Sequence, residues 1–144
     1  MDRPVDLTVA ILVSLAVAGA ALGLLPDPAP TAAFALRADA AGDSLTLTHR
    51  GGDPVDVRAA TLRVVVSGRP LRHQPQTPFF ATRGFRSGPT GPLNPGSDGR
   101  WTAGERARLR LAATNVPLLD PGDRVTVTLR VDGNRVARVV ARAR

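Results

Sequence analysis

The sequence predicts a mainly β protein, in which one N-terminal transmembrane helix is followed by an antiparallel β-sandwich. Three observations support this fold class. Residues 7–25 contain no charged side chain, and several segments beyond residue 33 alternate apolar with polar residues. Turn signals separate these segments about every 8 to 12 residues, which is typical of β-sandwiches. We therefore expect a helix and a short spacer at residues 1–30, and one β domain at residues 31–144.

The apolar stretch, LTVAILVSLAVAGAALGLL, has the length of a membrane-spanning helix. At about 1.5 Å per residue, its nineteen residues span roughly 28 Å, which is close to the hydrocarbon thickness of a bilayer. Pro26 cannot continue the helix and ends it. Arg3 precedes the stretch and the next basic residue is Arg37, so the positive-inside rule predicts a cytoplasmic N-terminus and an extracellular β domain.

The same stretch also fits a cleaved secretory signal, because Ala18-Gly19-Ala20 has the small-x-small pattern of a cleavage site. Cleavage there would release the β domain as a secreted protein. The apolar core of a signal peptide is about 7 to 15 residues long, so the greater length of this stretch favours retention in the membrane.

Small residues occupy one side of the predicted helix. Gly19 and Gly23 form a GxxxG pair, and Ala16 and Ala20 lie on the same face. This spacing lets two helices approach closely in lipid. These four residues are therefore the candidate sites of helix–helix assembly, although small residues are also common in membrane helices that do not associate.

Composition limits the chemistry of the β domain. The chain has no cysteine, which excludes disulfides and thiolate metal sites. Residues 31–144 contain eighteen arginines, no lysine and nine acidic residues. This excess favours acidic partners, namely nucleic acid, anionic polysaccharide, lipid headgroups or an acidic protein. The alternative is a diffuse solvated coat. Because the arginines form no continuous basic run, we expect no specific nucleic-acid binding.

The β domain follows a stiff spacer at residues 26–32, PDPAPTA, which has polyproline character. Period-two alternation then predicts strands at residues 34–39 and 44–49, joined by a turn at residues 40–43.

The middle of the chain continues in short extended pieces. Residues 50–54, RGGDP, predict a break. Val55 and Val57 start another extended piece, and the β-branched run at residues 61–66, TLRVVV, predicts a strand that is buried on both faces. Residues 67–70 predict the next turn.

Residues 72–104 predict a long irregular segment. It contains five prolines and four of the five aromatic residues of the chain. Loops of this length are often functional, so one interpretation is a recognition or assembly surface. The other is that the aromatic side chains plug the end of the sandwich core. In either case the segment should pack down, with Phe79 or Phe80 in the core.

The last third of the chain carries the clearest strand pattern. Arg106, Arg108 and Arg110 alternate with apolar residues, which predicts a half-buried strand with an outward arginine ladder. This ladder is the candidate ligand surface. After a turn at residues 117–123, strands at residues 125–131 and 136–141 flank a hairpin turn, Asp132-Gly133-Asn134. These strand lengths and turns indicate a sandwich of the immunoglobulin-like type.

No residue pattern indicates catalysis. His49 and His73 are the only histidines, and neither has a second ligand at metal-binding spacing, so we interpret His49 as structural. Glu105 is the sole glutamate, and residues 94–99, NPGSDG, resemble a calcium loop only in composition. We therefore expect no catalytic, cofactor-binding or metal site, and we predict that the protein is not an enzyme.

Three motifs follow the apolar stretch in order: LTLTHRGGD ending at Asp53, WTAGE from Trp101, and LDPGDRVTV from Leu119. Their order resembles that of archaeal type IV pilin-like proteins, particularly those of halophilic archaea. The resemblance implies a leader removed by a prepilin peptidase, helices packed into a filament core, and a β-sandwich outside. It implies a membrane location, surface filaments, and partners that are further copies or other pilin-like subunits.

Three functional hypotheses follow. The first is a structural subunit of a filament or envelope assembly, with a role in adhesion. The second is a monomeric membrane-anchored module that binds an acidic ligand through the arginine ladder. The third is a secreted domain from which the helix has been removed.

Overall fold

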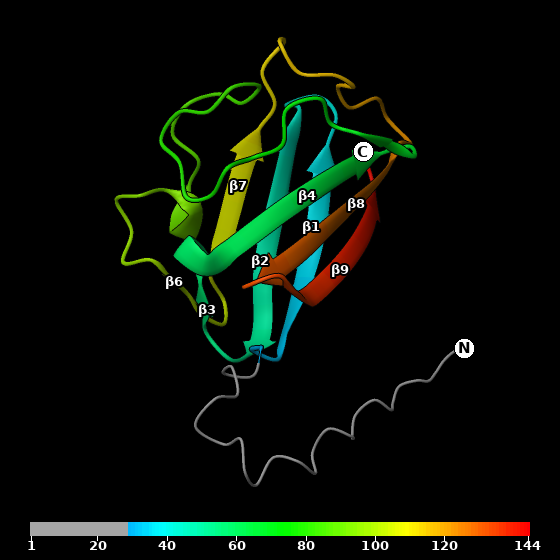
Figure 1. The fold of residues 1–144 in the computed structure, drawn as a ribbon. Helices are drawn as coiled ribbons and strands as arrows, with labels where there is room; N and C mark the ends of the chain where they lie inside the picture. Colours follow the sequence, from blue (N-terminus) through cyan, green and yellow to red (C-terminus); the bar gives the residue numbers. More distant parts are fainter. Residues whose placement is uncertain (1–28) are drawn as a thin grey trace, which may run out of the picture.

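The computed structural model describes residues 29–144, which form a mainly β structure of antiparallel sheets (Figure 1). The predicted helix at residues 7–25 lies outside the described residues, and so do the four assembly candidates Ala16, Gly19, Ala20 and Gly23. Within residues 29–144, the structure has no helix of the length and hydropathy that a membrane span requires.

Two sheets contain most of the strands. The three-stranded sheet has the order β1-β2-β7, with β1 at Ala32–Asp39, β2 at Ser44–Gly52 and β7 at Arg106–Arg110. The four-stranded sheet has the order β5-β4-β8-β9, with β4 at Ala60–Val66, β5 at Arg69–Pro70, β8 at Arg124–Val131 and β9 at Asn134–Arg142. In Figure 1, strands β4, β8 and β9 cross in front of β1, β2 and β7.

Four short elements complete the fold. Strand β3 (Val55–Asp56) pairs with β6 (Arg100–Trp101). Two 3-10 helices, η3 (Val57–Ala59) and η4 (Gly91–Leu93), lie between the strands.

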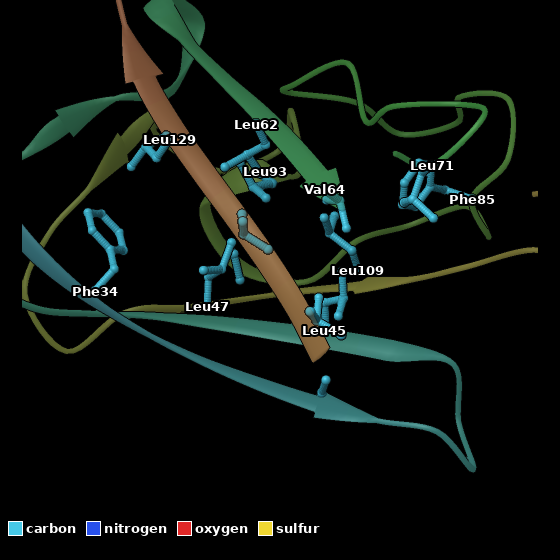
Figure 2. Close-up of a cluster of buried hydrophobic side chains, with 14 of the residues drawn as sticks. Phe34, Leu45, Leu47, Leu62, Val64, Leu71, Phe85, Leu93, Leu109 and Leu129 are labelled. Carbon is cyan, nitrogen blue, oxygen red and sulfur yellow. The ribbon is translucent and has the colours of Figure 1, made fainter. Parts of the chain in front are cut away.

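The apolar faces of the two sheets meet in one core. Leu45 and Leu47 of β2 point toward Val64 of β4 and Leu129 of β8 (Figure 2). Burial of each such side chain contributes about 1.5–3 kcal/mol. A slip of one residue in any strand would turn these side chains to solvent and bury the alternate polar ones, so the core also fixes the register.

Both predicted hairpins are confirmed. Strands β1 and β2 pair from Asp39 opposite Ser44, around the predicted turn at residues 40–43. Strands β8 and β9 pair from Val131 opposite Asn134. The predicted strand with the arginine ladder is β7.

Strand β4 differs from its prediction. The prediction that it is buried on both faces was wrong, because only alternate residues are buried and Thr61 and Arg63 are exposed. The β-branched run satisfies the strand preference on both faces, but no other layer covers the outer face in the described structure.

The break predicted at residues 50–54 begins later than expected, since β2 continues to Gly52, which pairs with Ala32. Gly52 has a φ of +102°, and a Cβ there would collide with the carbonyl oxygen of Thr31. Only glycine permits this approach of the two backbones, so the second glycine extends the pairing instead of ending it.

The long irregular segment packs down, as predicted. Phe79, Phe85 and Trp101 belong to the core, and Phe80 is 63 % exposed. The aromatic side chains therefore mostly fill the core, which favours the second interpretation of this segment.

Part of this segment also covers the free edge of β7. The N–H groups of Arg86 and Thr90 donate to the carbonyl oxygens of Arg110 (2.8 Å) and Arg108 (3.1 Å), respectively. At Gly91, with φ +78°, a Cβ would collide with the Arg106 carbonyl oxygen. This cover satisfies backbone groups that an exposed edge strand would leave unpaired.

Candidate anion-binding surface

The predicted arginine ladder lies on the outer face of β7. Arg106 and Arg108 are exposed, and Arg110 is half-buried. Across the sheet, Arg110 is opposite Ser44 of β2, which in turn is opposite Asp39 of β1. The Asp39 carboxylate and the Arg108 guanidinium both lie within 3.8 Å of the point where a Cβ on Gly42 would be. The ladder therefore shares its surface with a carboxylate.

A second set of arginines occupies the outer face of the four-stranded sheet. We call it the arginine face, and its five members come from β4, β8 and β9 and are all exposed: Arg63, Arg124, Arg130, Arg135 and Arg138. They surround a shallow open depression of about 480 Å³, which Val65, Gly68, Thr126 and Thr128 also line.

Strand register sets the spacing of the arginine face. Thr128 of β8 is opposite Arg63 of β4 on one side and Arg138 of β9 on the other. Neighbouring strands lie about 4.8 Å apart, so the backbones of these two arginines are about 10 Å apart. A β-bulge after Leu129 places Arg135 opposite Arg130, which gives a second row beside the first.

No aspartate or glutamate lines this depression. Asp123 precedes Arg124 in the chain, but its carboxylate accepts hydrogen bonds from the Asp120 N–H (2.8 Å) and the Ser67 hydroxyl (2.8 Å). The Asp120 bond and then the Ser67 bond lower the pKa of Asp123, so this carboxylate stays ionised and occupied within its turn. The arginine face is thus a positive surface without an acidic residue in its lining.

Guanidinium groups form paired hydrogen bonds with carboxylate, phosphate and sulfate oxygens. The hydroxyls of Thr126 and Thr128 add neutral donors and acceptors between the arginines. The depression is open and bordered by charge, unlike the concave and mostly apolar pockets that hold small molecules. Its chemistry therefore favours an extended anion over a small enclosed ligand.

The arginine face was not among the surfaces predicted from the sequence. A signal was present in β8, where Arg124, Thr126, Thr128 and Arg130 alternate with the buried valines and leucine. The sequence does not reveal which strands pair with β8. Only the pairing of β8 with β4 and β9 brings Arg63 and Arg138 to either side of Thr128.

Two of the polar residues to which the sequence assigned no site, His49 and Glu105, have structural contacts. His49 is fully buried, its ring lies 4.9 Å from that of Phe34, and its Nε2 donates to the Asp53 carbonyl oxygen at 2.8 Å. The Glu105 carboxylate accepts from the N–H and hydroxyl of Thr102 at 2.7 and 3.0 Å.

The other polar features to which the sequence assigned no site, His73 and residues 94–99, lie in the long segment. His73 bonds through its backbone N–H to the Asn115 side chain (3.1 Å). In the loop at residues 94–99, the Asn94 side chain accepts from the Gly96 N–H at 2.8 Å and so forms a turn. Across the part of the chain that the structure describes, no group of three His, Cys, Asp or Glu residues is placed to hold a metal ion.

Two of the three ordered motifs meet where the chain joins the β domain. The Gly104 N–H donates to the His49 carbonyl oxygen at 2.7 Å, and the His49 N–H donates to the Glu105 carbonyl oxygen at 3.0 Å. Thr31 and Asp53 are bonded twice, through Asp53 N–H to Thr31 O (2.8 Å) and Thr31 N–H to the Asp53 carboxylate (3.0 Å). We call residues 31, 49, 53 and 101–105 the junction.

Comparison with known protein families found no family that matches this chain, and comparison with curated proteins found no match.

Proposed function

We propose that the chain is a non-enzymatic cell-surface structural subunit of the type IV pilin-like kind. In this proposal, residues 7–25 form a helix that anchors the protein in the membrane and packs against other subunits through Ala16, Gly19, Ala20 and Gly23. Residues 31–144 form an extracellular, immunoglobulin-like β-sandwich head.

The strand order supports this head. Three strands in the order β1-β2-β7 face four strands in the order β5-β4-β8-β9. This order corresponds to the A-B-E and C′-C-F-G sheets of immunoglobulin-like sandwiches.

The junction is the observation that carries the proposal. A filament subunit has to hold its head in a fixed relation to the segment that assembles. Here Thr31, near the end of the proline-rich spacer, is held by two hydrogen bonds to Asp53, and the absence of a Cβ on Gly52 allows that contact. The spacer is stiff and short, so the head begins close to the predicted helix.

Substitution of Gly19 tests assembly. We expect Gly19→Arg and Gly19→Leu to remove the protein from filaments sheared off the cell surface, because both side chains prevent close helix–helix contact. Gly19→Leu keeps the segment apolar, so the protein should still be recovered in the membrane with a folded head. Gly19→Ala, which stays small, should assemble normally.

Normal filaments from cells carrying Gly19→Leu as the only copy would contradict the proposal. The folded state of the head is checked in each variant by protease resistance, so that loss of assembly is separated from loss of folding.

A second candidate function is a monomeric membrane-anchored module that binds an acidic ligand. The specific observation in its favour is the arginine face, which lacks the carboxylate found beside the predicted arginine ladder. The two candidate functions differ in oligomeric state. The Gly19 variants distinguish them, because Gly19→Leu should not change the function of a monomer that makes no helix–helix contact.

A further inference from the structure

We propose that the arginine face binds a linear acidic polysaccharide, whose carboxylate or sulfate groups pair with the arginines while its hydroxyls contact Thr126 and Thr128. This inference does not depend on filament assembly, because it concerns the outer face of the four-stranded sheet alone.

The composition of the arginine face decides between classes of polyanion. No aromatic side chain lines it, so it lacks the stacking platforms with which proteins hold single-stranded nucleic acid. Its apolar part is confined to one row, where Val65 and Val140 flank Thr126. That row has no aromatic or leucine side chain to enter a lipid interface, and no large anchor of the kind that dominates protein interfaces.

The remaining features match a hydrated sugar polymer. The Thr128 hydroxyl lies between Arg63 and Arg138 in one row, Arg130 and Arg135 form the adjacent row, and the depression is open. A polysaccharide with one acidic group per repeat presents charges separated by hydroxyls, which is the complementary pattern. Because the contacts are ionic and exposed, binding should weaken as salt rises.

The test compares two double variants of the full chain in non-ionic detergent. The first variant, Arg63→Gln with Arg138→Gln, removes two positive charges from the arginine face. The second, Arg106→Gln with Arg108→Gln, removes two positive charges from the ladder, so the net charge of the two variants is equal. Affinity is measured for polygalacturonate and for heparin at about 100 mM salt. Uncharged dextran, single-stranded oligothymidine and phosphatidylglycerol vesicles are measured in parallel.

We expect the first double variant to lose at least about tenfold in affinity for both acidic polysaccharides, since two charge-assisted contacts are removed. The second should lose less than about twofold, as expected for charges outside the site. All four residues are exposed, so both variants should unfold at the wild-type temperature.

Equal losses in the two double variants would overturn the proposal, because they would show a response to net charge alone. The proposal would also be overturned if the wild-type protein bound neither polygalacturonate nor heparin. If oligothymidine or vesicles bind more tightly than the acidic polysaccharides, and the Arg63→Gln, Arg138→Gln variant loses that binding, the arginine face would be assigned to nucleic acid or lipid instead.

Discussion

Replacement of Trp101 by alanine is expected to destabilise the β domain by about 3–5 kcal/mol. Trp101 is fully buried, and its ring packs edge-on against Phe34 with centroids 4.9 Å apart and planes at 75°. Its Nε1–H donates to the Glu105 carbonyl oxygen at 3.0 Å. Alanine would leave a large cavity inside the junction and remove one of the two hydrogen bonds that the Glu105 carbonyl oxygen accepts. This loss is a large fraction of the total stability of a typical domain.

Denaturant unfolding followed by circular dichroism measures this effect. Trp101→Phe keeps most of the buried surface and loses only the indole hydrogen bond, so we expect a smaller loss of about 1–2 kcal/mol. Phe80→Ala is the matched control, because this aromatic side chain is 63 % exposed and should change stability by less than about 0.5 kcal/mol. A Trp101→Ala protein as stable as Phe80→Ala would contradict the assignment of Trp101 to the core.

Asn115 holds the long irregular segment to the rest of the domain. Its side chain is fully buried and makes four hydrogen bonds. The Oδ1 atom accepts from the N–H groups of His73 (3.1 Å) and Val116 (3.0 Å). The Nδ2 atom donates to the carbonyl oxygens of His73 (3.0 Å) and Gly84 (3.1 Å). Each bonding position of the amide therefore has a specific partner.

Asn115→Asp is expected to destabilise the protein by about 3 kcal/mol or more at neutral pH, because a buried carboxylate would face two carbonyl oxygens without a proton to donate. Burial raises the pKa of this carboxyl above its unfolded value of about 4, so the loss relative to wild type should shrink as the pH falls toward about 4 and the protonated carboxyl regains one donor.

The fluorescence of Trp101, the only tryptophan, follows unfolding of this variant. Asn134→Asp makes the same chemical change at an exposed position and should be nearly neutral. Equal stabilities of the two variants at neutral pH would show that Asn115 does not anchor the segment.

Local patterns in the sequence predicted the strands well. Period-two alternation located both hairpins and β7, because each of these strands buries one face and exposes the other. The same rule failed for β4, where Val65 on the outer face conceals the alternation and only Thr61 and Arg63 reveal it. A residue type that suits both a buried and an exposed face of a strand carries little information about burial.

Long-range pairing accounts for what the sequence left undetermined. The arginine face depends on β8 lying between β4 and β9, and the junction depends on β2 meeting the segment from Trp101 to Glu105. Each involves residues far apart in the chain, whose association is set by the packing of the whole core. The predicted ladder of Arg106, Arg108 and Arg110 needed only one strand, which is why local alternation was enough to find it.

Mass spectrometry of the mature N-terminus, on material sheared from the cell surface and on membranes, tests the pilin-like proposal most directly. The proposal predicts that sheared filaments contain a chain starting within residues 4–7, after removal of a short leader. An intact N-terminus found only in membranes would contradict assembly and favour the anchored module. A start beyond Ala20 in the medium would show that residues 7–25 are a signal peptide and form no filament core.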